Sequence, residues 1–282
     1  GIIGLTKDGA LITNCANYGK LTFKHDISAC GRTDVFNGET AVKSFYGGVV
    51  GYAQDIVSNC HNYGVGECHT SSMESCCGAT IGYATTTSPI SNCSNSAATT
   101  CYIGHIALVL SDYTGGEPSH YIGGVIGNGK ANVDNVVNYE SGDLTVYTNV
   151  GGDFGGVIGY AAGSNIKLEN KAPMTLDFTY LGQTLANKAI MIGGVIAKNY
   201  ANDPNNKITV DSCTNSGKLI VQSCITDTVM TAIGGEGKQY TVNGKHYPNN
   251  PETVWPASEF GWGRIEISPA EAPKTDYLLT AI

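Results

Sequence analysis

A glycine-rich block recurs along this chain, and its repetition constrains the fold more than any other feature of the sequence. The fullest copy reads Gly-Gly-Val-Ile-Gly-Tyr, and the others vary one or two of its positions. The copies lie at residues 1–4, 47–52, 78–83, 123–127, 155–160 and 193–197. The copy at 78–83 is degenerate and aligns with the others at an offset of one residue. The repetition indicates stacked units, because one unit cannot bury its apolar face alone whereas a stack forms a continuous core.

A second block follows each glycine-rich block and contributes two aligned columns of residues. The first column is always apolar or thiol: Cys15, Cys60, Cys93, Val136, Leu168 and Cys213. The second column is asparagine in all six copies: Asn17, Asn62, Asn95, Asn138, Asn170 and Asn215. We predict that the first column is a ladder inside the stack. The second should be a stack of amides at a turn, since asparagine tolerates left-handed backbone conformations and its amide can bond to the next rung.

A short β-prone run comes third in each unit, and the units show no helical period. Three short segments per unit predict an all-β fold, a right-handed parallel β-helix or solenoid of about six rungs over residues 1–235. Surplus length falls after the third segment, roughly at residues 25–46, 66–77, 97–121 and 178–191. We expect these segments to be long loops on one edge of the column, and that edge is the expected functional surface.

The glycine-rich block followed by Asn-Cys-x-Asn-x-Gly-x-Leu resembles the GLUG-motif repeats of bacterial cell-surface and secreted proteins. The resemblance covers residues 1–235. It implies an extracellular or cell-surface β-solenoid, often part of an adhesin, and it carries over no catalytic residue. The chain starts inside a glycine pair and stops inside a strand-like run. We therefore expect a fragment that continues, end to end or covalently, into a longer protein.

Residues 236–282 depart from the repeat. The dipeptide Asn243-Gly244 lies between alternating β-forming residues and predicts a β-hairpin. We expect this segment to be a small C-terminal β cap over the open end of the solenoid, or the start of a second β domain. Parts of it resemble the C-terminal β-sandwich of heparinase II/III-like polysaccharide lyases. The matching runs are 242–248, 262–269 and 276–279. The catalytic Tyr, His and Asn of those enzymes lie in other regions, so the resemblance transfers no catalytic residue.

The charge and the apolar content of the chain exclude several classes of partner. Its formal net charge is −8, with 16 Lys and Arg against 24 Asp and Glu. This balance argues against nucleic acid or an anionic membrane surface as a partner. Arg32 and Arg264 are the only arginines, which disfavours a site for bidentate recognition of phosphate. The longest strongly apolar run, 106–110, is far shorter than the roughly 20 residues of a membrane span, so no such span is expected.

The chain has ten cysteines, and four of them belong to the apolar column, where thiols pack as small hydrophobes. The other six are Cys30, Cys68, Cys76, Cys77, Cys101 and Cys224. Cys68 and Cys101 each follow a column cysteine by eight residues, so we expect them to be neighbours across rungs. A disulfide between them stays open for an exported protein. Reduced packing thiols are favoured, because ladder residues about 4.8 Å apart with parallel side chains suit a disulfide poorly.

Tyr52, Tyr83 and Tyr160 share one position of the repeat and are the candidate ligand-binding residues. Aligned aromatic rings can stack on the apolar faces of sugar rings. The alternative, which we favour, is a packing ladder along the solenoid. No metal site and no cofactor are expected, since the spacing of the Cys and His residues fits no compact zinc site.

Enzyme sites on β-helices need clustered aspartates, or aspartate with Ca²⁺ and basic residues. The sequence has no adjacent Asp pair and lacks the GxSxG, P-loop and HExxH patterns. We therefore predict a non-catalytic structural or adhesive β-solenoid that binds a surface protein or glycan through its inserted loops. The alternative is the accessory, carbohydrate-binding β region of a secreted polysaccharide-processing protein, with polysaccharide lyase as the runner-up activity of the longer protein.

Overall fold

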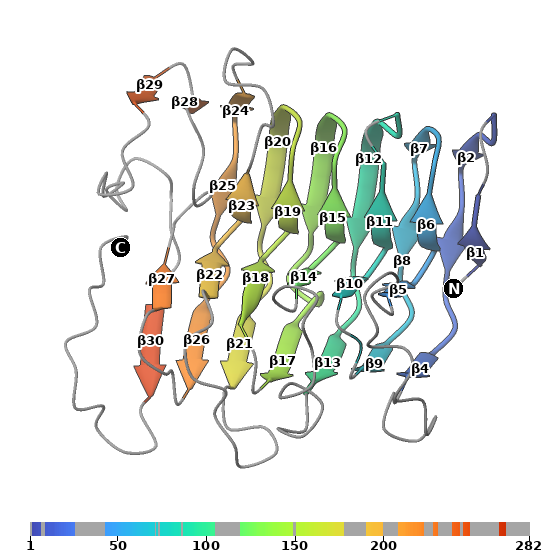
Figure 1. Cartoon of the computed structure of the whole chain (residues 1–282), viewed down its shortest axis with the longest axis horizontal. Helices are drawn as coiled ribbons and strands as arrows, with labels where there is room; N and C mark the ends of the chain where they lie inside the picture. The colour runs from blue at the N-terminus through green and yellow to red at the C-terminus, as the bar shows by residue number, and fades with distance from the viewer. Residues whose placement is uncertain are drawn as a thin grey trace, which may run out of the picture.

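A computed structural model describes residues 2–6, 9–25, 43–70, 72, 74–85, 87–104, 119–148, 151–177, 190–199, 208–222, 228–230, 239–242, 245–248 and 265–268. Every regular element among these residues is a β-strand, and none is a helix. Successive turns of the chain, here called rungs, stack their strands in parallel to build four sheets (Figure 1). The predicted all-β fold of stacked parallel strands is confirmed.

Sheets 1 and 2 contain the strands on either side of the glycine-rich block. Sheet 1 consists of β1 (Ile3–Leu5), β6 (Val50–Ala53), β11 (Ile81–Ala84), β15 (Ile126–Gly129), β19 (Ile158–Ala161) and β23 (Ile196–Asn199). Sheet 2 consists of β5 (Lys43–Gly47), β10 (Glu74–Gly78), β14 (Ser119–Gly123), β18 (Gly152–Gly155), β22 (Ile190–Gly193) and β27 (Thr228–Met230).

Sheets 3 and 4 complete each rung. Sheet 3 consists of β2 (Ile12–Thr13), β3 (Ala16–Asn17), β7 (Val57–Ser58), β8 (His61–Asn62), β12 (Ile90–Asn95), β16 (Val133–Asn138), β20 (Asn165–Asn170), β24 (Ile208–Asp211), β25 (Thr214–Asn215), β28 (Gln239–Val242) and β29 (Lys245–Pro248). Sheet 4 consists of β4 (Leu21–His25), β9 (Gly66–Thr70), β13 (Thr99–Ile103), β17 (Leu144–Thr148), β21 (Met174–Asp177), β26 (Leu219–Gln222) and β30 (Ile265–Ser268).

The prediction of three β segments per unit is wrong, because each rung also contributes a strand to sheet 2. The segments 25–46, 66–77, 97–121 and 178–191, which the sequence predicts to be loops, overlap strands β5, β10, β14 and β22, and strands β9 and β13 lie wholly inside two of them. Strand β10 reads Glu-Ser-Cys-Cys-Gly, and four of its five residues are buried. A strand covered on both faces shows no alternation of polar and apolar residues, so the period-two pattern could not reveal it.

The glycine-rich block is the corner between sheet 2 and sheet 1. Gly78 pairs with Gly47, and Ile81 pairs with Val50, so the copy at 78–83 aligns without the predicted offset. Each sheet 2 strand up to β22 ends on a glycine of this block. A Cβ atom at Gly155, for example, would overlap the carbonyl oxygen across the corner, which explains why this position stays glycine.

Long and short connections alternate between sheet 4 and sheet 2. The long ones join β4 to β5, β13 to β14 and β21 to β22, and comprise residues 26–42, 104–118 and 178–189. The short ones join β9 to β10, β17 to β18 and β26 to β27, and comprise 71–73, 149–151 and 223–227. All six connections leave sheet 4 and enter sheet 2, so the strand ends that the long ones join lie on one edge of the column and are spaced by two rungs, roughly 10 Å.

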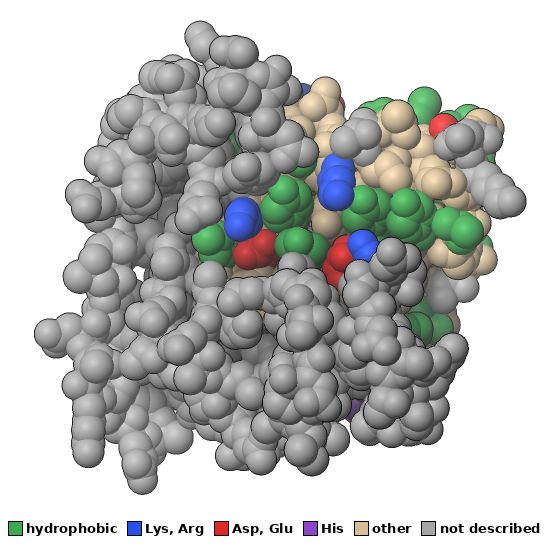
Figure 2. Space-filling view, in the orientation of Figure 1, with side chains coloured by type: hydrophobic (Ala, Val, Ile, Leu, Met, Phe, Trp, Pro, Cys, Tyr) green, Lys and Arg blue, Asp and Glu red, His purple; other side chains and the backbone are tan. Residues whose placement is uncertain are grey.

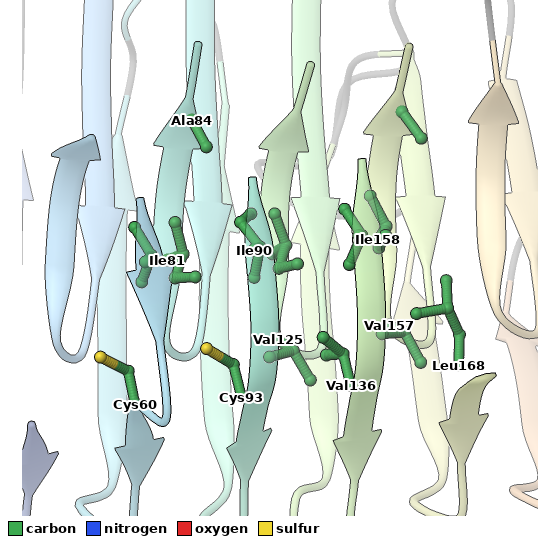
Figure 3. Packing of buried hydrophobic residues seen from close by; sticks show 14 of the residues in the cluster. Cys60, Ile81, Ala84, Ile90, Cys93, Val125, Val136, Val157, Ile158 and Leu168 are labelled. Carbon is green, nitrogen blue, oxygen red and sulfur yellow. The ribbon is translucent and has the colours of Figure 1, made fainter. Parts of the chain in front are cut away.

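Two clusters of buried side chains fill the column. One lies between sheets 1 and 3, and Figure 3 shows its row of Cys60, Cys93, Val136 and Leu168. The other lies between sheets 2 and 4 and includes Phe154, the largest fully buried side chain. Both clusters continue from rung to rung, as expected for stacked units that bury their apolar faces against one another.

The tail adds strands to the C-terminal end of this stack. Strand β28 pairs in parallel with β24 of sheet 3, and β29 returns antiparallel to it, so the hairpin predicted at 243–244 is present. Strand β30 pairs in parallel with β26 of sheet 4. The repeat-like run at 233–235 lies outside the described residues.

Candidate functional site

The apolar and thiol column lies in one line inside the solenoid. Cys93, Val136 and Leu168 are register partners on neighbouring strands. Cys60 and Cys213 extend this line in the same buried cluster, and Cys15 packs against it half-buried at the N-terminal end. The burial of Cys213 raises the pKa of its thiol to about 12. The thiol of Cys213 therefore serves as a small apolar side chain at neutral pH.

The asparagine column forms a continuous ladder of hydrogen-bonded amides. The Nδ2 of each asparagine donates to the Oδ1 of the next, with N–O distances of 2.8 to 3.0 Å. In the rung of Asn95, Nδ2 also donates to the carbonyl of Ala97 at 2.9 Å, and Oδ1 accepts the N–H of Ala97 at 3.2 Å. From Asn62 to Asn215 the side chains are at most 2% exposed. The ladder thus ties all six rungs together and satisfies both donors of each amide between its ends.

Left-handed backbone occurs in a different column from the predicted one. The described non-glycine residues with positive φ are Asn14, Asn59, Asn92, Asn135, Lys167 and Ser212, at 52° to 57°. They directly precede the apolar column and lie three residues before the ladder. The prediction that the ladder asparagines take this conformation is wrong, because each of them is the last residue of a sheet 3 strand and has extended backbone. The left-handed corner favours asparagine in the first four rungs, and Lys and Ser replace it later.

The candidate tyrosines belong to an aromatic row, comprising Phe45, Tyr52, Tyr83, Tyr121 and Tyr160, where sheets 1 and 2 meet. Tyr52 and Tyr83 stack with ring centroids 4.8 Å apart and planes 15° apart. The ring of Phe45 meets both rings edge-on, at 5.0 and 5.4 Å. Tyr160 lies two rungs further on and packs against Tyr121 at 5.0 Å. The position between Tyr83 and Tyr160 holds an asparagine, so the three candidate residues do not form one continuous stack.

Charged side chains flank the aromatic row. The ammonium of Lys43 lies 2.6 Å from the carboxylate of Glu74, and this hydrogen bond raises the pKa of Lys43. The ammonium of Lys130 lies 5.3 Å from the ring centroid of Tyr83. Figure 2 shows a row of hydrophobic side chains across this face with basic and acidic groups beside it. The row therefore offers ring edges, hydroxyls and charges to solvent, while the stacking of Tyr52 on Tyr83 covers one face of each ring.

Two other stacks follow the rungs on other sheets. Tyr18 and Tyr63 stack at 4.9 Å and are 75% and 43% exposed. On sheet 4, the rings of His69, Tyr102 and Tyr147 stack at 4.4 and 5.0 Å. Sequence comparison of the units missed the second stack, since a histidine begins it. Alignment of the third segments by register would have revealed it.

A cavity of about 420 Å³ opens at the N-terminal end of the column. It is lined by Gly4, Leu5, Phe23, His25, Lys43, Ser44, Phe45 and Tyr52. Its polar groups include the ring nitrogen Nδ1 of His25, which lies 2.7 Å from the hydroxyl of Ser44. The cavity thus joins one end of the aromatic row to the end of the core, and its lining combines apolar side chains with the ammonium of Lys43.

The cysteines outside the apolar column form a group of their own. Cys68 and Cys101 are register partners, so they are neighbours across rungs as predicted. The thiol of Cys77 lies 3.3 Å from that of Cys68, a contact that the sequence did not indicate. All eight cysteines that the structure describes are free thiols. Cys30 and Cys224 lie outside the described residues.

Comparisons with protein-family profiles, curated proteins and solved structures gave no match. In the described part of the chain, no group of three or more His, Cys, Asp or Glu side chains is placed to hold a metal ion. The same part contains no helix of the length and apolarity needed to cross a membrane.

Proposed function

We propose that this chain is a non-catalytic structural or adhesive β-solenoid of a bacterial cell-surface or secreted protein, and that it binds its partner through its inserted loops. The observation that carries the proposal is the alternation of long and short connections at one edge. Because a three-residue connection is enough to join sheet 4 to sheet 2, the added length of the others is not needed for the fold. Surplus segments gathered on one edge of a solenoid are typical of a binding surface.

The stacked rungs hold the strand ends that flank these loops in fixed positions. The asparagine ladder runs the length of six rungs, and the two apolar clusters continue beside it. A spacing of two rungs leaves each long connection roughly 10 Å, about the width needed for a chain to leave the edge and return. The resemblance of residues 1–235 to GLUG repeats supports an extracellular or cell-surface location. The partner is a surface protein or a glycan.

The proposal is tested by shortening the loops. In one variant, residues 26–42, 104–118 and 178–189 are each replaced by Ser-Ser-Met, the native connection at 71–73. A matched control replaces only 149–151 with the same tripeptide. Binding of each protein to immobilised mucin, which presents polypeptide and glycan together, is measured by surface plasmon resonance. We expect at least an about tenfold loss of affinity in the first variant and none in the control.

Circular dichroism shows whether the shortened variant keeps its β structure. If the parent protein fails to bind mucin, or if the shortened variant is folded and binds as tightly as the parent, the loops are not the binding surface and the proposal is wrong.

A second candidate function rests on the aromatic row, where Lys43, Glu74 and Lys130 lie beside the tyrosine rings. Such polar groups next to aromatic edges can hydrogen-bond to sugar hydroxyls, which fits an accessory carbohydrate-binding region. The stacking of Tyr52 on Tyr83 weakens this candidate, because it covers one face of each ring and a sugar ring needs an open aromatic face. A glycan array separates the two functions. Glycan binding that Tyr52→Ala abolishes and loop shortening leaves intact would favour this second candidate.

A further inference from the structure

Three thiols meet inside the core between sheets 2 and 4. Cys68 comes from β9, Cys77 from β10 and Cys101 from β13, and none is more than 1% exposed. All three belong to the same buried cluster. The thiol sulfurs of Cys68 and Cys77 lie 3.3 Å apart. The other five described cysteines are Cys76 and the four of the apolar column, so this group is separate from the column.

The two possible partners of Cys68 differ in geometry. Cys101 is its register partner on the neighbouring parallel strand, where side chains run side by side and suit a disulfide poorly. Cys77 instead lies on the facing sheet, on the strand that follows after the short connection 71–73. Its thiol therefore approaches that of Cys68 from across the core. This arrangement favours the pair Cys68–Cys77 over the ladder pair.

The surroundings distinguish the pair from the other thiols nearby. Hydrogen bonding with Cys101 and burial hold the pKa of both Cys68 and Cys77 well above the usual range. The adjacent Cys76 pairs in register with Phe45 and takes no part in the cluster. The fully buried, high-pKa thiols are inert toward reagents in the folded state. Any covalent chemistry must therefore take place before β9 and β10 close on each other.

We propose that Cys68 and Cys77 form a disulfide when the chain folds in an oxidising compartment. The thiolate of one cysteine attacks a disulfide of a thiol oxidoreductase or of a small-molecule disulfide and releases one thiol of the oxidant. The thiolate of the second cysteine then displaces the oxidant's other sulfur. The two cysteines lose two protons and two electrons, and the oxidant's disulfide becomes two thiols. The new bond links β9 of sheet 4 to β10 of sheet 2, the two strands that the short connection 71–73 joins. Cys101 stays reduced beside it.

The test uses the full chain exported to a bacterial periplasm, with free thiols alkylated under denaturing conditions before digestion. Non-reducing peptide mass mapping should find the peptides of Cys68 and Cys77 linked, with a mass lower by two hydrogens than that of the two free peptides. Cys68→Ser and Cys77→Ser should each abolish this species. The matched controls Cys101→Ser and Cys76→Ser should keep it.

Two results would overturn the inference: both cysteines recovered in the alkylated form from the exported parent protein, or Cys68 linked to Cys101. Circular dichroism of the exported protein and of its serine variants verifies that each is folded, so a missing linkage cannot be ascribed to misfolding. The inference takes from the proposed function only the exported location. Because the experiment imposes that location, its failure would leave the loop-binding proposal untouched, and failure of mucin binding would leave the disulfide untouched.

Discussion

Asn95 offers the sharpest test of the asparagine ladder, because it lies in the middle of the ladder and is 0% exposed. Its amide takes part in four hydrogen bonds: two with the backbone of Ala97, one donated to Asn138 at 3.0 Å and one accepted from Asn62 at 3.0 Å. Asn95→Ala removes all four and leaves their partners in the core. Solvent cannot reach these groups readily, so the loss is not offset by water.

The expected cost follows from these contacts. A buried hydrogen bond contributes about 1 kcal/mol net, and a partner left unsatisfied costs that or more. Four bonds therefore predict a loss of about 3 to 4 kcal/mol in the free energy of unfolding for Asn95→Ala. Asn17→Ala is the matched control, since Asn17 has the same role at the half-exposed N-terminal end. Water replaces its bonds, so we expect a loss of about 1 kcal/mol or less.

Urea unfolding followed by circular dichroism gives the global loss. A stack of repeats can unfold in parts, so hydrogen exchange at the amide of Ala97 gives the local one. Equal losses for Asn95→Ala and Asn17→Ala would refute the idea that burial makes the ladder stabilising.

Asn95→Asp extends this test to pH. The variant places carboxylate oxygens opposite the carbonyl of Ala97 and the Oδ1 of Asn138, and it buries a charge, so the pKa of the new carboxyl must rise on folding. Protonation restores one donor. The carboxyl therefore has a lower pKa in the unfolded state than in the folded state. The free energy of unfolding of Asn95→Asp should rise as the pH falls toward 4. The parent should show no such rise. A flat difference between the two proteins across this range would contradict the reasoning.

The remaining predictions concern the corner and the core. A Cβ atom at Gly155 overlaps the carbonyl oxygen of Ile158, so Gly155→Ala should cost about 2 to 4 kcal/mol, and a neutral result would show that the corner relaxes easily. Gly129 has room for a methyl group and lies between two alanines in register, so Gly129→Ala should raise stability by about 0.5 kcal/mol or more. Phe154→Ala empties the largest fully buried site and should cost about 3 to 5 kcal/mol, measured by urea unfolding. Asn135 has a φ of 54°, so Asn135→Gly should be nearly neutral and Asn135→Val should cost about 1 to 2 kcal/mol; the reverse order would count against left-handed strain.

The fold could be predicted from the sequence where one residue type repeats at one place. The asparagine column needed no alignment to other proteins, and its register is the one expected, from Asn17 paired with Asn62 to Asn170 paired with Asn215. The fourth strand of each rung could not be predicted. Residues such as Cys76 and Cys77 are buried on opposite faces of β10, so no period-two pattern distinguishes that strand from a loop.

The candidate site was less predictable, because it depends on pairs that no spacing reveals. Tyr52 and Tyr83 share a repeat position, which correctly places them in adjacent rungs. The sequence does not show that these two rings stack face to face, nor that the ring of Phe45 packs against them from the neighbouring sheet. The contact between Cys68 and Cys77 could not be predicted for the same reason, since it joins residues of two different sheets.

The ladder and the aromatic stacks join neighbouring rungs over different stretches of the column. The ladder links all six rungs, from Asn17 to Asn215, through hydrogen-bonded amides. The aromatic stacks are shorter: Tyr52 with Tyr83 on sheet 1, and His69, Tyr102 and Tyr147 on sheet 4. Each stacked pair contributes about 0.5 to 1.5 kcal/mol beyond its burial. The contacts between rungs are therefore strongest from the rung of Asn62 to that of Asn138, where the ladder and these stacks coincide.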